Sequence, residues 1–428
     1  MDCSSKLESF CFSHLEDELH STFAKSRHCD TSVYVENEEL FQTLDAHCEQ
    51  SISGDGCASP IVIAGEPGSG KSAFLSNWTD RRRSSAPPTR SLEYDEFVFW
   101  HAIGCSRLST QVSHLLRRLV NSLTKHFELK EVMDLADDKL PWVLPRILER
   151  AAKKGRVVIV IDGGLQHICS KDEDLGLRWL PLRLPPNVRM IISVMLPTVH
   201  GNLSRNSDYA TMLHAKTQHT WDEIQRRRWP IVLIERMDSG NVTSVIEKFH
   251  TMGTKEISLS EKRNLKECIS LHPMAGNPFF LTYILRAIYH ANELKYDMQQ
   301  CLRRWASSKV KSSSYLIEQI LATFESGFVK NETLGSEMGR NGAYILGPML
   351  GHSLSLLFVA RHGLHENELF ELLGYVQEKS KWIDKTSGTV VPVKLKIVKM
   401  LMQKKKRLID VFRSFDTDVS CIKIEISL

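Results

Sequence analysis

The stretch from Gly65 to Ser72 reads GEPGSGKS, and it constrains the fold of this chain more than any other segment. It fits the pattern G-x-x-x-x-G-K-[ST] in full, with the apolar run PIVIA before it and the run SAFLSNW after it. A glycine-rich turn between a buried strand and a helix lets backbone amides and the helix N-terminus surround a phosphate group. We therefore predict a phosphate-binding loop, in preference to an ordinary glycine turn with an exposed lysine.

The residue types in this loop also predict what each position does. Lys71 is expected to reach the β- and γ-phosphates, and the Ser72 hydroxyl to ligate magnesium. The predicted cofactors are ATP or ADP with Mg²⁺. The loop residues expected to contact them are Gly65, Gly68, Ser69, Gly70, Lys71, Ser72 and Ala73.

A second part of the predicted site follows the apolar run from Val157 to Ile161, which ends at Asp162. A carboxylate at the carboxyl end of a neighbouring strand can hold the magnesium ion, and open α/β sheets bind ligands at this edge. The alternative is an aspartate that only begins a turn. Ser193, polar within the run RMIISV, is a candidate for sensing the γ-phosphate or else a residue that serves packing alone.

Gln166 stands where an ATPase usually carries a glutamate. An amide can orient a water molecule by hydrogen bonding but cannot accept its proton. With Lys71, Asp162 and Gln166 as the catalytic candidates, we expect slow hydrolysis or none. The acidic run from Asp172 through Glu173 to Asp174 could supply a substitute base or simply form a solvated loop. Because GTPases position water with a glutamine, this hypothesis concerns the rate of hydrolysis.

The order of apolar and helical patterns predicts the fold class. Strands are expected in PIVIA, DEFVFWHAI, VVIVI and RMIISVML, with helical patterns between them. This alternation favours an α/β fold, a P-loop NTPase parallel sheet with flanking helices. From about Asp238 the pattern becomes helical. A length of 428 residues suits two or three domains.

Composition sets further limits. The chain is 42% hydrophobic and 25% charged, and its apolar runs fall short of the ~20 residues that a membrane span needs. The N-terminus lacks a signal-peptide or transit-peptide pattern, so we expect a cytoplasmic or nuclear location. Ten cysteines occur without any C-x-x-C pair, which argues against a zinc ribbon, a redox dithiol or a disulfide framework. Most of them are expected to be reduced and buried.

Positive charge is concentrated at the end of the chain. From Gln377 onward, twelve Lys or Arg stand against six Asp or Glu, a difference of +6, while the whole chain carries +4, so the remainder carries −2. The body is therefore not expected to bind nucleic acid. The run KMLMQKKKRLIDVF could contact RNA, acidic lipid or an import receptor, or form a solvated face. The triplets Arg81–Arg83 and Arg226–Arg228 are interpreted as exposed helix ends rather than as nucleic-acid contacts.

Several segments in their order along the chain resemble one family. They are VYVENEEL, GEPGSGKS, FVFWHAIGCSRLST, VVIVIDGGLQ, LPPNVRMIISV, NPFFL and RHGLHENELFELL. Together they resemble the NACHT-type STAND P-loop NTPases, closest to the nephrocystin-3 group and related NACHT proteins with tetratricopeptide or WD repeats. The resemblance covers roughly residues 30 to 376.

This resemblance implies a domain organisation and three further site residues. Tyr34 and Val35 match the position that lines the adenine, and Pro278 in NPFFL matches the proline that closes over the base. His362 falls in the winged-helix segment and is expected to be a surface residue rather than a phosphate sensor. The implied parts are a polar segment at 1–29, a NACHT-type nucleotide-binding α/β domain at 30–237, a small helical domain at 238–310, a winged-helix-like domain at 311–376 and a basic tail at 377–428.

The chain departs from the family pattern in three places. The adenine segment carries Glu36 and Asn37 where related sequences often have Gly-Arg. The second carboxylate motif reads DGGLQ and lacks the two later acids that many NACHT domains carry. Repeats are expected to follow in this group but do not, so the chain resembles an N-terminal fragment or a shortened form.

These features favour an ATP- or ADP-binding switch or scaffold, in which the nucleotide state controls interdomain closure and assembly with protein partners. One alternative is an active P-loop ATPase that acts on nucleic acid or remodels proteins; another is a passive scaffold with a structural P-loop. We do not expect a nucleic-acid partner or a membrane span, and self-association is a second possible form of assembly. A link to cilia follows from family analogy alone.

Overall fold

The computed structural model describes twelve stretches of the chain. They are residues 3–28, 33–50, 57–84, 96–106, 108–129, 136–168, 177–197, 208–252, 259–293, 296–307, 309–310 and 313–330. The chain divides into two compact units, Met1–Met237 and Asp238–Leu428. The two units are described separately below.

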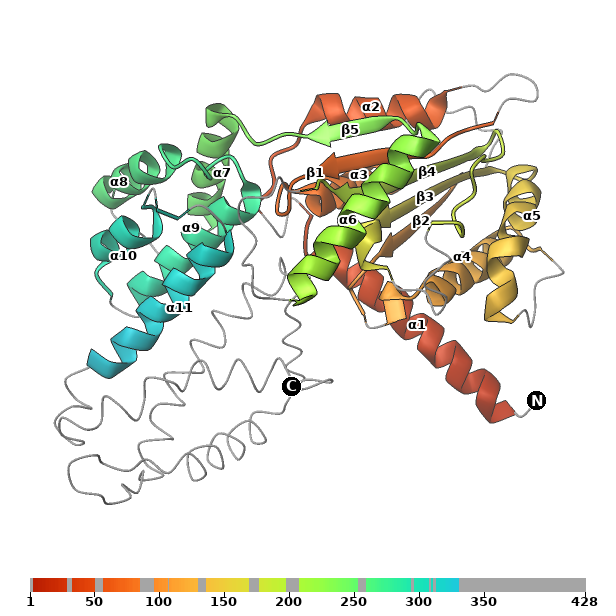
Figure 1. Ribbon diagram of the computed structural model, residues 1–428, viewed down its shortest axis with the longest axis horizontal. Coiled ribbons are helices and arrows are strands. Elements are labelled where there is room, and N and C mark those ends of the chain that lie inside the picture. The colour runs from red at the N-terminus through yellow and green to blue at the C-terminus, as the bar shows by residue number, and fades with distance from the viewer. Residues whose placement is uncertain are drawn as a thin grey trace, which may run out of the picture. The chain divides into compact units, whose positions relative to one another are not determined.

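The first unit is built on a five-stranded parallel sheet with the order β2-β3-β4-β1-β5 (Figure 1). This arrangement confirms the α/β fold class. Four of the strands coincide with the apolar runs that the sequence singles out, whereas β5 was not predicted. Its four residues are all apolar, but the run is short and the strand lies at an edge of the sheet, where it is only partly buried. The strands are β1 (Ile61–Gly65), β2 (Glu96–Ala102), β3 (Arg156–Asp162), β4 (Val188–Met195) and β5 (Ile231–Ile234).

Helices cover both faces of this sheet. The α-helices of the first unit are α1 (Cys3–Lys25), α2 (Glu38–Glu49), α3 (Lys71–Ser84), α4 (Val112–His126), α5 (Leu140–Ala152) and α6 (Asp208–Arg227), and three short 3-10 turns lie at Leu108–Thr110, Asp137–Lys139 and Leu165–His167. Because successive strand side chains point to opposite faces, each strand feeds two separate cores. Both cores are needed to bury a parallel sheet.

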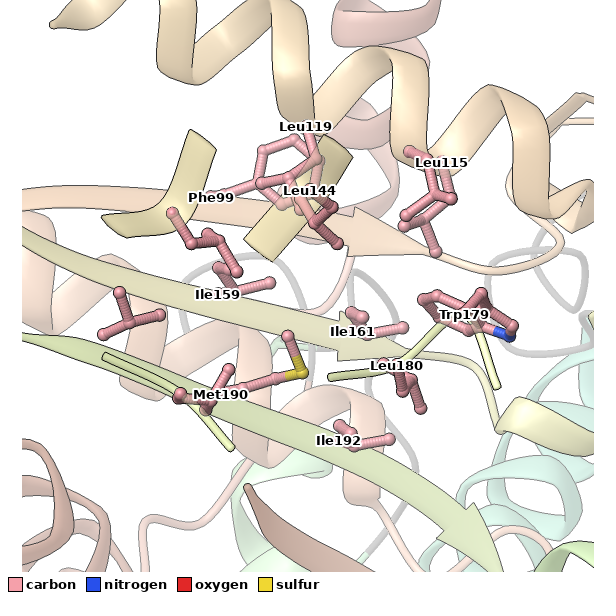
Figure 2. Close-up of a cluster of buried hydrophobic side chains, with 14 of the residues drawn as sticks. Phe99, Leu115, Leu119, Leu144, Ile159, Ile161, Trp179, Leu180, Met190 and Ile192 are labelled. Carbon is pink, nitrogen blue, oxygen red and sulfur yellow. The ribbon is translucent and has the colours of Figure 1, made fainter. Parts of the chain in front are cut away.

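One core lies between the sheet and helices α4 and α5 (Figure 2). Ile159 and Ile161 of β3 and Ile192 of β4 point into it, and Leu119 of α4 and Leu144 of α5 cover them. The intervening residues of the same strands turn to the other face. There Val158, Val160 and Ile191 meet Phe41 and Leu44 of α2 and Phe74, Leu75 and Trp78 of α3. The P-loop helix is thus fixed by its own core.

Helix α1 occupies the segment for which the sequence predicted only polar chain. Its 23 residues have no strong amphipathic pattern, which explains why periodicity does not reveal it. It is attached at its C-terminal end, where Phe23 and Ala24 pack against the core beneath α2 and α3 and polar groups add hydrogen bonds. The Ala24 carbonyl accepts a hydrogen bond from Ser76 Oγ at 2.8 Å, and the Ala102 amide donates to His20 Nδ1 at 3.0 Å. Burial lowers the pKa of His20 strongly, so the ring is neutral and can accept that bond.

The second unit is helical where it is described, as the pattern after Asp238 predicts. Its helices are α7 (Ser239–Met252), α8 (Leu259–Ser270), α9 (Pro278–Glu293), α10 (Met298–Trp305) and α11 (Ser313–Lys330). Asn277 and Asp297 accept backbone hydrogen bonds at the starts of α9 and α10, as N-cap residues do. The winged-helix segment beyond residue 330 and the basic tail lie outside the described residues.

The structure also bears on two expectations from the composition, which concern membrane spans and the burial of cysteines. Within the described stretches, no helix has both the length and the apolar character that crossing a bilayer requires. Among the cysteines with described side chains, Cys48 and Cys301 are buried, whereas Cys57 and Cys268 are exposed. The expectation of buried cysteines is therefore met only in part.

The core in Figure 2 predicts a stability difference within one helix. Leu144→Ala removes a side chain that is 1% exposed, and should lower the free energy of unfolding by about 2 to 5 kcal/mol through lost packing. Trp142→Ala, two residues away and 81% exposed, should change it by less than about 0.5 kcal/mol. Urea unfolding followed by circular dichroism measures both. Equal losses in the two variants would contradict the described orientation of α5.

Candidate functional site

The P-loop joins β1 to α3 through backbone conformations that require glycine. Gly68 and Gly70 have φ values of +76° and +90°, a region that side chains disfavour. Gly65 is needed for space, since a Cβ there would lie 2.6 Å from Ser69 Oγ. The Gly70 carbonyl accepts the first helical hydrogen bond, from the Phe74 amide at 2.9 Å. The glycines of the motif therefore shape a tight turn into the start of α3.

The start of α3 provides the anion-binding geometry that the motif predicts. Lys71, Ser72 and Ala73 form its first turn, and the amides of a first helical turn have no partner within the helix. They are oriented along the helix axis, where the helix dipole also favours negative charge. This end of α3 is therefore suited to phosphate oxygens.

The Lys71 ammonium is bound by its own loop. It donates to the carbonyl oxygens of Gly65 at 3.0 Å and Glu66 at 2.8 Å, and lies 3.4 Å from Ser69 Oγ. Burial lowers the pKa of Lys71 to about 8, while the nearby negative charges of Asp162 and Glu66 act in the opposite direction. A phosphate that took over these contacts would return the lysine to a more favourable environment for its charge.

Asp162 ends β3 as a fully buried carboxylate. Ser193 on β4 donates a hydrogen bond to Asp162 Oδ1 at 2.8 Å. The same hydroxyl oxygen accepts from the amides of Gly163 at 3.0 Å and Gly164 at 3.3 Å. Because strand β4 lies between β3 and β1, Ser193 is on the strand between the one that ends at Asp162 and the one that leads into the P-loop. Ser193 thereby holds the turn after Asp162, and its role as a γ-phosphate sensor stays a prediction.

Three buried polar atoms remain at this turn without a hydrogen-bond partner among the described residues. They are Asp162 Oδ2 and the amide atoms Nε2 and Oε1 of Gln166. Gln166 is 3% exposed, and a Cβ on Gly164 would lie 2.4 Å from its Nε2. Buried polar groups are normally paired, so these atoms fit a ligand that brings its own polar groups. A carboxylate oxygen is the ligand type that Mg²⁺ takes, so Asp162 Oδ2 fits the predicted metal role.

The turn itself is held tightly against β2. Gly163 has φ +97°, and a Cβ there would approach the Ile103 carbonyl oxygen to 2.3 Å. The Ile103 amide donates to the Asp162 carbonyl at 2.7 Å. No side chain fits at Gly163 without a shift of backbone. The two glycines that the sequence places after Asp162 therefore fix the direction in which Gln166 leaves the strand.

The residues that the family resemblance assigns to the base belong to both units: Tyr34 and Val35 to the first and Pro278 to the second. Tyr34 packs against the cluster that contains Phe74, and Val35 is partly buried. Asn37 caps α2 by accepting from the Leu40 amide at 3.1 Å, a local reason for asparagine at this position. Pro278 begins α9 in the second unit, so its role at the base remains a prediction. The Asp172–Asp174 run and His362 lie outside the described residues.

The arginine triplets are not simply exposed helix ends. Arg82 is 5% exposed and forms a two-pronged pair with Glu96, with both N–O distances at 2.9 Å. Arg227 donates to the carbonyl oxygens of Leu177 and Leu180. Such internal contacts at the centre of each triplet could not be predicted, because their partners are distant in the sequence. They also leave fewer guanidinium groups for an external ligand.

One ion pair at the P-loop also went unpredicted. Arg236 follows β5 and pairs with Glu66, the second residue of the loop motif, at 3.0 Å. The sequence offered no signal for it, since β5 itself was not recognised and the two residues are 170 positions apart.

Comparison with known proteins shows which families the chain is similar to. The AAA ATPase domain family matches residues 35–192. Human nephrocystin-3 is 24% identical over 366 residues, which is 84% of this chain and 23% of that protein. Mouse NACHT and WD repeat domain-containing protein 2 is 26% identical over 199 residues, covering 45% of this chain and 11% of that protein. The chain is similar to the NACHT-like P-loop NTPases, near the nephrocystin-3 group.

The chain spans less than a quarter of the length of the nephrocystin-3 proteins that it matches from human and Xenopus laevis. An AAA ATPase domain implies nucleotide binding, usually with Mg²⁺.

Two solved structures have a similar chain path. A Walker-type ATPase of Pyrococcus abyssi is 13% identical with a TM-score of 0.39, and covers 87% of this chain and 89% of its own. A chain of Drosophila ORC bound to DNA is 12% identical with a TM-score of 0.41, and covers 91% of this chain and 84% of its own. The fold class rests on the parallel sheet itself.

The hydroxyl of Ser193 predicts a stability effect at the site. Ser193→Ala would leave the Gly163 and Gly164 amides and Asp162 without their shared partner, and should lower the free energy of unfolding by about 1 to 3 kcal/mol. Ser244→Ala, which removes an exposed hydroxyl bonded to the Gly240 carbonyl, is the control and should have little effect. A guanidinium-chloride titration compares the two. Equal stabilities would show that the network does not hold the turn.

The lowered pKa of Lys71 predicts how stability depends on pH. At pH 7 the wild type must fold with a desolvated ammonium, so Lys71→Met should stabilise the fold, by on the order of 1 to 3 kcal/mol. Between about pH 8 and pH 10.5 the unfolded chain holds the Lys71 proton more tightly than the folded chain does. The free energy of unfolding of the wild type therefore rises with pH in this range, and the difference between the wild type and Lys71→Met shrinks. Denaturant unfolding at pH 7 and at pH 10 measures this difference in stability. Lys139→Met, at an exposed lysine, is the control. A difference that does not change with pH would contradict the desolvation.

Proposed function

We propose that the chain is a nucleotide-controlled switch that binds ATP or ADP with Mg²⁺ and hydrolyses ATP slowly or not at all. The observation that carries this proposal is Gln166, whose amide lies buried in the turn after Asp162 where a general base would stand. A carboxamide cannot take a proton from water at neutral pH. The site is therefore equipped to hold a nucleotide and lacks the group that would hydrolyse it quickly.

The residues of the P-loop account for binding. The first-turn amides of α3 and the Lys71 ammonium would hold the phosphates, with Lys71 exchanging its carbonyl partners in the loop for phosphate oxygens. The Ser72 hydroxyl and Asp162 Oδ2 would hold the magnesium ion. Bound there, the ion would neutralise charge on the phosphate oxygens. Ser193 keeps Asp162 in position throughout.

Gln166 accounts for the slow rate. Its amide can hydrogen-bond a water molecule and orient it, but general-base help is typically worth about a hundredfold or more in rate. Tight binding with slow turnover prolongs the bound state. A long-lived bound state is what a conformational switch requires.

The output of the switch would be contact with protein partners. Relatives of this chain are named for repeats, as in the NACHT and WD repeat domain-containing protein 2, and repeat arrays offer extended binding surfaces. The division into units at Met237 and Asp238 supports a nucleotide-binding domain at 30–237 and a helical domain from 238 to 310, followed by the proposed winged-helix-like domain. Tyr34, Val35 and Pro278 would enclose the base. The protein would be cytoplasmic.

The proposal is tested by binding and single-turnover hydrolysis. Wild-type protein should bind ATP and ADP in a magnesium-dependent way and show little hydrolysis. Lys71→Ala should lose most of the affinity, because its ammonium is the positive charge that the loop itself holds. Gln166→Glu places a carboxylate of the same shape at the turn, and hydrolysis should rise by about a hundredfold. Lys139→Ala, at an exposed lysine, is the control for both measurements.

Two outcomes would contradict it. Rapid wild-type hydrolysis would show that another group serves as base, and the chain would be an active ATPase. An absence of nucleotide binding in the wild type, with Lys71→Ala indistinguishable from it, would leave the P-loop a purely structural element.

A further inference from the structure

Glu66 is the acidic residue within the phosphate-binding motif GEPGSGKS. A carboxylate this close to an anion site repels the ligand that the loop is shaped to hold. Its backbone carbonyl already accepts from the Lys71 ammonium at 2.8 Å, so the residue is part of the turn itself. The structure must therefore compensate the Glu66 charge if the loop is to bind a nucleotide well.

Arg236 supplies that compensation in the described structure. Its Nε lies 3.0 Å from Glu66 Oε2 and its Nη2 lies 3.3 Å from Glu66 Oε1, a two-pronged arrangement. Two-pronged pairs hold a guanidinium in a defined orientation toward the carboxylate. Arg236 thus faces Glu66 with its donors.

The register of the sheet brings the two residues together. Gly65 is paired with Ile234 in the β1–β5 ladder, and a Cβ on Gly65 would lie 3.1 Å from the Ile234 carbonyl oxygen. Glu66 comes one residue after Gly65, and Arg236 comes two after Ile234. The two segments leave the sheet side by side, so the ion pair follows from the topology rather than from a chance contact of loops.

We propose that Arg236 sets the affinity of the P-loop for the nucleotide by neutralising Glu66, and that breaking this pair weakens binding. This inference rests on the proposed nucleotide site. Arg236 acts through Glu66 and is a positioning residue, not a phosphate ligand.

The pair is suited to regulation by its exposure and its position. Both side chains are nearly half exposed, and exposed ion pairs are weak and sensitive to salt, so the pair opens readily. Arg236 lies two residues before Asp238, where the second unit begins. Asp238 in turn caps α7, accepting from the Asn241 amide at 2.7 Å. Only Met237 and Asp238 separate Arg236 from the first residue of α7.

A double-mutant cycle tests this role with Arg236→Gln, Glu66→Gln and the double variant. Arg236→Gln leaves Glu66 uncompensated, so affinity for Mg-ATP should fall on the order of three- to tenfold at low ionic strength, and the more negative ATP should lose more than ADP. The loss should shrink in 0.5 M salt, where exposed charges are screened. The double variant removes both charges and should return to near wild-type affinity. Titration calorimetry measures all four proteins.

Two further variants separate charge from other effects. Arg236→Lys keeps the positive charge and should retain most of the affinity. Arg226→Gln removes an exposed guanidinium that pairs with Glu223 on α6, away from the P-loop motif in the sequence, and should leave binding unchanged. Thermal melting of each variant shows whether it is folded.

The outcomes distinguish this inference from the proposed function. If the double variant binds as weakly as Arg236→Gln, or if Arg236→Gln binds like the wild type, the inference is overturned while the nucleotide site stands. If the wild type binds no nucleotide, the proposed function fails and this inference with it.

Discussion

The hydrogen bond from the Ser193 hydroxyl to Asp162 Oδ1 is the contact on which the rest of the candidate site depends. It joins the ends of β3 and β4, and the same oxygen accepts from the two glycine amides that follow Asp162. The carboxylate is held through one oxygen, and the other stays available at the edge of the sheet. Because the turn cannot shift toward β2 at Gly163, this bond also determines where Gln166 lies.

The charged side chains of the P-loop already have partners within the protein. Lys71 donates to the carbonyl oxygens of its own loop, and Glu66 is paired with Arg236. At Lys71 a nucleotide would therefore replace existing contacts, whereas at Asp162 Oδ2 it would supply a partner that the described residues do not. Its net affinity would depend on the difference between the two sets of contacts, which makes small changes in the internal pairs effective.

Local sequence patterns predicted those parts whose structure depends on neighbours in the chain. The glycine spacing of the loop predicted its turn, and Gly68 and Gly70 have the positive φ values that only glycine adopts freely. The apolar runs predicted β1 to β4 because both faces of these strands are buried. Edge strand β5 has a run of only four apolar residues and is only partly buried, and it was not predicted. Helix α1 lacks a strong amphipathic pattern, so hydrophobic periodicity does not reveal it.

The sequence by itself determined the fold class and the candidate residues Lys71, Ser72, Asp162 and Gln166, because a loop motif and strand-end residues are readable within a few positions. Only the tertiary structure decided their partners. Ser193 meets Asp162 across 31 positions and Arg236 meets Glu66 across 170, through the strand order β3-β4-β1-β5. Which side chains neutralise or hold one another depends on the pairing of distant strands, and no local pattern encodes that pairing.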